Sequence, residues 1–384
     1  MVLRRRAWRP AAVAAACLLT LSGAGAAGAD APPPAQVRSL WETAVPGNAI
    51  SRDCGYSVPV PGAVRRGLWL FCDSTWKGSA TGFWLGDTAA TGPYTPGRVP
   101  DALAEIPTPG APAVPVATPA ARAPAPFLPV PTGVRLPSGQ SCTVPGFSYQ
   151  ASWISGAAPE PGPDGGGKVL LTYTDVCTTS ATISTQRFGV VEYDPAANAL
   201  SGQAQVFTDP AELPFQRALG SPVFAGGHLY LVGAVCDTGG PGACAAGRVV
   251  LARVGATPRE WRDAAAYRWW DGAGWTADHG AAASILPGAR PMAAVHAADY
   301  GALGRGFAVV EQTDITGGYR VWRSDALTGG WRVARTGTAP CGGQHGLDLC
   351  RAYIGHPELS TRDDLLMSYY DPAAAHVGVL RTPW

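Results

Sequence analysis

The sequence predicts an all-β protein folded as a five-bladed β-propeller. A short apolar run that ends in an acidic residue occurs five times along the chain, and no segment has a convincing helical period. The composition, with 49 Gly, 36 Pro and only 15% charged residues, is typical of a protein rich in strands and turns. Each blade of a propeller has an apolar face that only the next blade can bury, so five such units would close into a ring. A two-sheet sandwich followed by a second domain is the structural alternative.

Each repeat contains a first strand, a turn, an apolar second strand with an acid at its end, and a third strand. The acids are Asp73, Asp175, Asp237, Asp314 and Asp371, after the runs LWLFCD, LLTYTD, LYLVGAVCD, FAVVEQTD and LLMSYYD. We expect the first strands at CGYSVPV, FSYQASWIS, SPVFA, MAAVHAADY and IGHPELS, and the third strands at GFWLG, FGVVEYD, RVVLARV, YRVWRSD and HVGVLRTPW. A strand near Trp41 is expected to pair with the last blade and latch the ring.

Residues 1–29 are predicted to form a secretory signal peptide, and residues 30–384 a single propeller domain. Three arginines at positions 4–6 give the leader a basic start, an apolar run follows over residues 11–21, and small residues up to Ala29 fit a cleavage site. This run is too short to span a bilayer, and no later apolar run reaches about eighteen residues. We therefore expect a secreted, extracellular protein without a transmembrane segment. The sequence leaves open whether export uses the general or the twin-arginine route.

A Pro/Ala-rich segment lies at about residues 100–140 and includes PTPGAPAVPVATPAARAPAPFLPVP. Proline cannot donate a hydrogen bond to a β-ladder, so this composition disfavours strands. We expect a long surface excursion within the domain, ordered in part by Phe127 and Leu128. A linker between two domains is the alternative.

The cysteines predict a disulfide-stabilised protein. Nine are present, and outside the leader residue Cys17 they are Cys54, Cys72, Cys142, Cys177, Cys236, Cys244, Cys341 and Cys350. An even number in an exported chain is typical of disulfides, and we expect neighbours to pair as 54–72, 142–177, 236–244 and 341–350, out of 105 formal possibilities. A hairpin centred on residue 63 sets position i opposite 126 − i, which puts Cys54 directly opposite Cys72. Metal binding is the alternative, although no CxxC spacing or Cys/His cluster supports it.

Charge and motif content argue against several functions. The formal net charge is +1 and no basic patch interleaves with aromatic residues, so nucleic acid is not an expected partner. The chain has no P-loop, dinucleotide-binding or GxSxG motif, which argues against nucleotide cofactors and a serine-hydrolase elbow. We predict no metal or other cofactor, and a monomer.

Polar residues on the innermost strands should converge on one mouth of the propeller. Asp53 begins the first blade and Glu358 lies in the fifth, and these blades become neighbours when the ring closes. Two carboxylates that face one cleft suit glycosidic hydrolysis, one as general acid and the other as base or nucleophile. A separation of about 5 Å would give retention of the anomeric configuration, and roughly 6.5–9.5 Å inversion.

Asp53 and Glu358 are therefore the predicted catalytic pair, and Asp73 and Asp175 are expected to tune their charge. The predicted substrate-binding residues are Arg52, Tyr149, Gln150, Trp153, His296 and His356, among which Trp153 is the candidate for stacking on a sugar ring. All of these residues have a structural alternative. Aspartates at strand ends often cap turns, and repetition favours that role for the blade acids. Histidine, tyrosine and tryptophan on inner strands can be packing residues.

Several motifs resemble a known family. RDCGYSVPV followed by LWLFCDSTW is similar to the RDGGYS…LWLFGDT opening of secreted actinobacterial five-bladed propellers long grouped under a domain of unknown function. YRWWDGAGWTAD, YRVWRSDALTGGW and GHPELSTRDDLLMSYYDP resemble later blades, so the likeness covers most of residues 50–384. Some relatives in this group are endo-acting D-arabinanases that cut cell-wall arabinan, and the resemblance matches Asp53 to the acid that opens blade one. Cys54 and Cys72 replace family glycines next to the expected site.

The sequence thus predicts a secreted carbohydrate-active propeller whose partner is a polysaccharide or oligosaccharide. The leading hypothesis is a glycoside hydrolase that acts on a cell-wall or environmental polysaccharide, arabinan-like by resemblance. A non-catalytic propeller that binds glycan at the same mouth is the alternative. A scaffold for protein interactions would instead have apolar channel residues.

Overall fold

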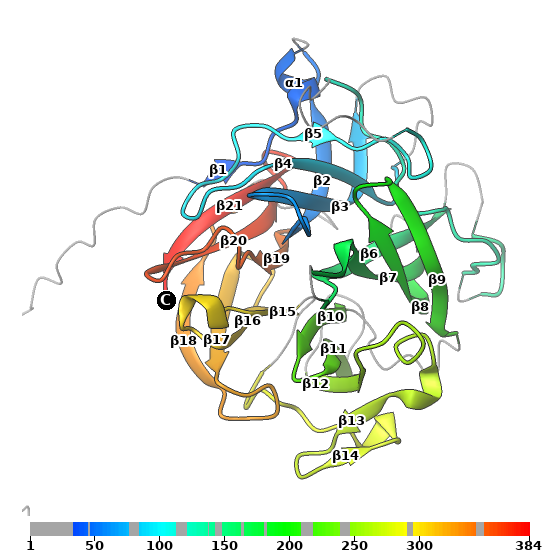
Figure 1. The fold of residues 1–384 in the computed structure, drawn as a ribbon, viewed down its shortest axis with the longest axis vertical. Coiled ribbons are helices and arrows are strands. Elements are labelled where there is room, and N and C mark those ends of the chain that lie inside the picture. The colour runs from blue at the N-terminus through cyan, green and yellow to red at the C-terminus, as the bar shows by residue number, and fades with distance from the viewer. Residues whose placement is uncertain are drawn as a thin grey trace, which may run out of the picture. The chain divides into compact units, whose positions relative to one another are not determined.

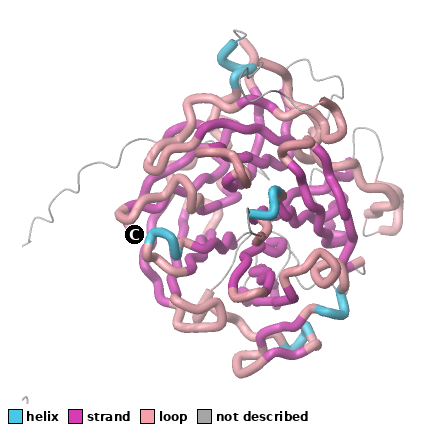
Figure 2. The backbone as a smooth tube through the Cα atoms, in the orientation of Figure 1, coloured by secondary structure: helices cyan, strands magenta, loops and turns pink. Residues whose placement is uncertain are grey.

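A computed structural model of the protein confirms the five-bladed β-propeller, with five small sheets arranged in a ring (Figure 1). Strands make up nearly all of the regular structure, and the helices are few and short (Figure 2). The structure describes residues 34–44, 47–76, 84–112, 121–136, 138–142, 148–162, 165–179, 183–208, 218–238, 246–289, 295–342 and 349–384. The predicted signal peptide and Cys244 lie outside these ranges. Within them, no helix has the length and apolar character needed to cross a bilayer.

The sheets are consecutive antiparallel blades. Blade 1 consists of β2 (Ile50–Pro59), β3 (Arg66–Trp76), β4 (Thr88–Pro93) and β5 (Ala104–Glu105). Blade 2 consists of β6 (Ser148–Pro159), β7 (Val169–Thr179), β8 (Ile183–Asp194) and β9 (Ala199–Phe207). Blade 3 consists of β10 (Ala218–Ala225), β11 (His228–Thr238), β12 (Ala246–Gly255), β13 (Arg268–Trp270) and β14 (Trp275–Thr276).

Blade 4 consists of β15 (Val295–Asp299), β16 (Phe307–Gln312), β17 (Gly318–Ser324) and β18 (Arg332–Thr338). Blade 5 consists of β19 (Arg351–Gly355), β20 (Asp364–Asp371), β21 (His376–Pro383) and the N-terminal β1 (Ala35–Gln36). The connections contain the helix α1 (Leu40–Ala44) and the 3-10 turns η1 (Gly165–Gly167), η3 (Ala264–Ala266), η4 (His279–Ala281) and η5 (Gly301–Leu303).

The ring closes through both its inner and its outer strands. Inner strands β2, β6, β10, β15 and β19 each contact the next, and β19 contacts β2 (Figure 1). On the outside, β1 pairs with β21, with Ala35 opposite Val379, and the Val37 amide donates to the Val377 carbonyl at 2.9 Å. The expected latch is therefore present, formed by residues just before Trp41, which itself lies in α1.

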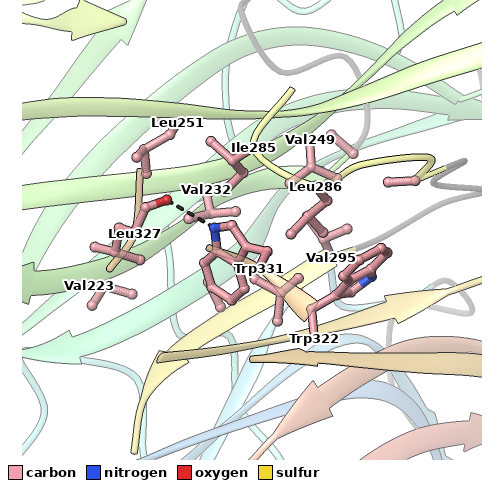
Figure 3. Close-up of a cluster of buried hydrophobic side chains, with 14 residues drawn as sticks. Val223, Val232, Val249, Leu251, Ile285, Leu286, Val295, Trp322, Leu327 and Trp331 are labelled. Atoms are coloured by element: carbon pink, nitrogen blue, oxygen red, sulfur yellow. Dashed lines mark hydrogen bonds between the residues drawn. The ribbon is translucent and has the colours of Figure 1, made fainter. Parts of the chain in front are cut away.

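The apolar core lies between adjacent blades rather than within one sheet. Figure 3 shows the contact between blades 3 and 4, where Val232 and Leu251 pack with Trp322 and Trp331. The Trp331 indole nitrogen donates to the Leu327 carbonyl at 3.1 Å, so this buried ring has its one polar atom satisfied. Burial of each blade face by its neighbour is what makes a closed ring of small sheets stable.

Three expectations about strands need correction. In blade 1 the third strand is β4, whereas the described part of GFWLG, from Trp84 onwards, forms an isolated bridge between Leu85 and Ser74. The Pro/Ala-rich segment is more than a surface excursion, because β5 forms the outer strand of blade 1. Phe127 and Leu128 are buried, and their amides donate to Asp87 Oδ1 at 2.9 and 2.6 Å. The strand expected at IGHPELS is β19, which ends at Gly355.

Blade 1 encloses an ion pair that the sequence did not predict. Arg52 Nη1 lies 2.9 Å from Glu105 Oε1, and both side chains are completely buried. The Arg52 guanidinium lies over the Phe71 ring, 3.7 Å from its centroid. Burial raises the pKa of Glu105, and the positive charge of Arg52 opposes that rise. The structure thus places Arg52 inside the blade, whereas the sequence analysis expected it to bind substrate.

We predict that Glu105→Gln lowers the free energy of unfolding by about 3–5 kcal/mol, because it leaves the Arg52 charge buried without its partner. Urea denaturation followed by tryptophan fluorescence measures this change. Arg52→Met combined with Glu105→Leu should cost less than the single variant, since neither charge is then buried alone. A Glu105→Gln protein as stable as the wild type would contradict the prediction.

Candidate functional site

Three of the four predicted disulfides are present. Cys54–Cys72, Cys142–Cys177 and Cys341–Cys350 have Cα–Cα distances of 5.4, 5.7 and 6.0 Å. The predicted pair 236–244 includes a residue outside the described ranges. Disulfides of this number are typical of proteins that fold in an oxidising compartment.

A bulge in blade 1 sets two aspartates opposite each other. Strands β2 and β3 pair with Arg52 opposite Ser74, and the next pair is Cys54 opposite Phe71. Between these pairs β2 has one residue, Asp53, and β3 has two, Cys72 and Asp73. The prediction that Cys54 lies directly opposite Cys72 is therefore wrong by one position, although the disulfide forms. Two residues opposite one is the geometry of a β-bulge, a device that re-aims side chains next to active sites.

Asp73 is held by two donors from β6 of blade 2. The Tyr149 hydroxyl donates to Asp73 Oδ2, and the Trp153 indole nitrogen donates to Oδ1 at 2.8 Å. Burial and the nearby charge of Asp53 raise the pKa of Asp73 to about 7, while the two hydrogen bonds oppose the rise. A carboxyl group with this pKa is partly protonated at neutral pH, so it can donate a proton to a reacting group.

Asp53 is held by blade 5. Arg351 Nε lies 2.9 Å from Asp53 Oδ2, and the Arg351 guanidinium lies 4.1 Å from the centroid of the Tyr370 ring. Asp53 Oδ1 is buried and has no hydrogen-bond partner among the residues that the structure describes. We call Asp53, Asp73, Tyr149, Trp153 and Arg351 the mouth cluster, because they come from the starts of β2, β6 and β19 and the end of β3.

Glu358 lies at a different level of the molecule. It follows β19, and the Ser57 hydroxyl in β2 donates to its Oε1. Ser57 lies four residues after Asp53 on the same strand, and a rise of about 3.3 Å per residue separates these levels by about 10–13 Å. This exceeds the roughly 6.5–9.5 Å between the carboxyl groups of inverting glycosidases. The structure thus places Asp53 beside Asp73, and Glu358 beside Ser57, and the Asp53–Glu358 pair stays a prediction.

The residues around Glu358 form a buried polar group of their own. His356 Nδ1 lies 2.6 Å from Ser57 Oγ, and burial, with a smaller effect of His296, lowers the pKa of His356 to about 3. Burial raises the pKa of Glu358 to about 7. His296 Nδ1 accepts the Gly355 amide at 3.2 Å, and burial lowers the pKa of His296 to about 4. Both histidines are therefore neutral at pH 7, and neither contacts the mouth cluster in the described structure.

The other two predicted site residues lie in blade 2. Asp175 accepts the Ser152 hydroxyl at 2.7 Å and pairs with Arg187 at 2.9 Å, so its partners are separate from those of Asp73. Burial raises the pKa of Asp175, and the Ser152 hydrogen bond and the Arg187 charge oppose the rise. Gln150 is half-buried beside Tyr149 at the start of β6.

The sequence analysis missed Arg351 and the pairing of Asp53 with Asp73. The second omission was avoidable, because the same hairpin register that relates Cys54 to Cys72 relates residue 53 to residue 73. Arg351 gave no signal, because the strand expected from Ile354 onwards begins three residues earlier, at Arg351. Its contact with Asp53 depends on ring closure between blades 5 and 1, which no local pattern encodes.

Comparison with known proteins supports the fold. Neither a protein-family model nor a curated protein matches the sequence. Among solved structures, a candidate hydrolase from Bacteroides ovatus ATCC 8483 is similar, with a TM-score of 0.52 and 15% identity over 86% of this chain and 85% of that one. A GH43_1 enzyme from Xanthomonas citri has a TM-score of 0.48 and 12% identity over 91% and 89% of the two chains. A family 117 glycoside hydrolase produced by Zobellia galactanivorans has a TM-score of 0.44 and 10% identity over 91% and 88%. At these identities the similarity concerns the fold alone.

We predict that Tyr149→Phe raises the pKa of Asp73 above its value of about 7, because the lost hydrogen bond favours the charged carboxylate. Carbon-detected NMR titration of aspartate side chains measures this pKa directly. Tyr193→Phe is a matched control, since its hydroxyl donates to Asn198 in the same blade. An unchanged or lower pKa in Tyr149→Phe would contradict the assigned contact.

Proposed function

We propose that the protein is a secreted glycoside hydrolase that uses Asp53 and Asp73 as its pair of carboxylates. The observation that supports this most is the bulge of blade 1, which sets the two acids opposite each other. Burial, and then the charge of Asp53, raise the pKa of Asp73 to about 7. Two carboxyl groups with different environments are what glycosidic hydrolysis requires. Export is supported by the three disulfides and by the leader predicted at residues 1–29.

In this proposal Asp73 is the general acid. In its protonated form, which is partly populated at neutral pH, it gives its proton to the leaving-group oxygen of the glycosidic bond. Asp53, positioned by Arg351, acts as the base that activates water or as the nucleophile. Trp153 and Gln150, both half-buried at the start of blade 2, are candidates for contacts with sugar rings and hydroxyls.

The proposed substrate is a polysaccharide of cell walls or of the environment. Arabinan is the specific candidate, because the RDCGYSVPV and LWLFCDSTW motifs resemble a group that includes endo-acting D-arabinanases. The motif residues that this resemblance concerns are also those that carry Asp53 and Asp73.

One observation favours a binding propeller without catalysis. Both oxygens of Asp73 already accept hydrogen bonds, and Asp53 is ion-paired with Arg351. Such satisfied carboxylates can instead be fixed parts of a glycan-binding surface. Under this alternative the wild type has no turnover, and substitution of either aspartate would only weaken glycan binding.

We predict that Asp53→Asn and Asp73→Asn each reduce hydrolysis by about 10²–10⁴-fold, the usual effect of losing a general acid or base. The assay is release of reducing ends from a panel of polysaccharides that includes arabinan and arabinogalactan. Asp371→Asn is the control, since its carboxylate accepts the Ala373 amide in a turn at 3.1 Å.

Glu358→Gln decides between the two possible pairs in the same assay. We expect a smaller loss than in Asp53→Asn, because Glu358 contacts Ser57 rather than the mouth cluster. A loss as large as that of Asp53→Asn, in a protein with intact circular dichroism, would support the Asp53–Glu358 pair instead. A wild type without turnover on any substrate, but with glycan binding, would support the binding alternative.

We predict that kcat/KM decreases above about pH 7. The pKa of Asp73 is raised, so its proton is present below about pH 7 and is lost as the pH increases through this value. A pH–rate profile between pH 4 and 9 tests this on the best substrate of the panel. Activity that instead increases through pH 8 would exclude Asp73 as the acid.

A further inference from the structure

The Cys54–Cys72 disulfide lies directly behind the two aspartates of the mouth cluster. Each cysteine is the chain neighbour of one acid: Cys54 follows Asp53, and Cys72 precedes Asp73. A carboxylate oxygen of Asp53 lies within 4.8 Å of both sulfur atoms. The crosslink therefore joins β2 and β3 at the point where both carry the proposed catalytic side chains.

The backbone at this crosslink has an unusual conformation. Cys54 has a φ of 64°, a left-handed value that residues with a side chain rarely adopt. Gly55 follows with a φ of 96°, and a Cβ atom there would lie 2.8 Å from Val377 Cγ1 of blade 5. A non-glycine residue held in this region points to a local constraint that the surroundings impose.

Cys54 and Gly55 lie within the irregular part of the β2–β3 ladder. The register shifts twice: Asp53 opposes Cys72 and Asp73, and Gly55 is then an extra residue on β2, so that pairing resumes with Tyr56 opposite Leu70. The two shifts compensate, so the pairing on either side keeps one register and the irregularity is confined to the residues around the disulfide and the two aspartates. The positions of both carboxylates therefore depend on a backbone arrangement that the disulfide crosses.

We propose that the Cys54–Cys72 disulfide is a positioning device for the proposed carboxylate pair, which fixes the distance and relative orientation of Asp53 and Asp73. The inference rests on the proposed function for its catalytic consequence, and on geometry alone for the positioning itself. The alternative is a disulfide that stabilises the fold by restricting the unfolded chain and does not position the aspartates.

Other disulfides hold the partners of the pair. Cys142 Sγ lies 3.0 Å from the carbonyl oxygen of Tyr149, whose hydroxyl donates to Asp73. Cys350 precedes Arg351, which pairs with Asp53. Because these two crosslinks also touch the mouth cluster, neither is a suitable control for the first.

Several groups around the pair contribute to its titration. Tyr149 and Trp153 donate to Asp73 from β6, and Arg351 pairs with Asp53 from β19. The charge of Asp53 also raises the pKa of Tyr56, and that of Asp73 raises the pKa of Asp87, each after a larger effect of burial. If these neighbours keep their contacts, a change in the distance between the two aspartates should be visible as a change in the pKa of Asp73.

The test is the double variant Cys54→Gly/Cys72→Gly, because glycine tolerates the left-handed backbone at position 54. Carbon-detected NMR titration gives the pKa of Asp73, and steady-state kinetics give kcat and KM. We expect the pKa of Asp73 to decrease by at least about one unit, because its repulsion from Asp53 and its burial both lessen. We expect kcat to decrease by about 10–100-fold with little change in KM, as for a misplaced catalytic group.

Leu251→Ala is the stability control. Leu251 is completely buried between blades 3 and 4, so its truncation should lower the Tm without touching the mouth cluster. The proposal predicts an unchanged Asp73 titration in this control. An unchanged titration in the double variant too, with only a lower Tm, would overturn the proposal.

The outcome separates this inference from the proposed function. A wild type without turnover, whose Asp73 titration still changes in the double variant, would remove the hydrolase and keep the positioning role. If the double variant does not fold, graded reduction of the folded wild type, followed by alkylation and mass mapping of the opened pair, provides the same comparison. An Asp73 titration that is unaffected when only this pair is open would then overturn the proposal.

Discussion

Closure of the ring is the constraint on which the rest of the structure depends. No blade buries its own apolar faces, as the packing of Trp322 and Trp331 of blade 4 against blade 3 shows. The same closure brings blade 5 beside blade 1, and only then does Arg351 reach Asp53. The mouth cluster is therefore a product of the whole ring, since its five residues come from three blades. Stability and the candidate site have the same physical origin.

The fold could be predicted because its signals are local and repeated. The apolar run that ends in an acid recurs along the chain, for example as LLTYTD and FAVVEQTD. In each of these two copies the apolar run forms the second strand of a blade. The errors occurred where a strand has little apolar pattern. Strand β4 reads TAATGP, whose small residues are buried although they are not strongly hydrophobic, and β5 has two residues inside a proline-rich segment. The formation of these two strands therefore depends on tertiary contacts rather than on the β-propensity of their residues.

The site could be predicted only in part. A sequence shows which residue types are present, but not which of them lie at the same height along the propeller axis. Asp53, Asp73, Tyr149 and Trp153 were all identified as candidates, and the structure brings them together. Glu358 follows β19 and contacts Ser57 rather than the mouth cluster, a placement that no sequence pattern indicated. Arg52 was expected to bind substrate, whereas the structure pairs it with Glu105 inside the blade. A bulge of one residue decides such questions, and sequence periodicity does not resolve it.

The strand β1 has a consequence for the order of events in biosynthesis. The outer edge of blade 5 is completed by Ala35 and Gln36, which precede blade 1 in the sequence, paired with residues 379 and 378, which follow blade 4. A chain that emerges from its N-terminus must therefore keep β1 unpaired until almost all of the protein has been made. Blades 1 to 4 can form in succession, but the exposed faces at the two open ends of the arc remain without cover during this time. The ring is thus completed only after β21 has been made, and a chain truncated before β21 would be left as an open arc with apolar surfaces in water.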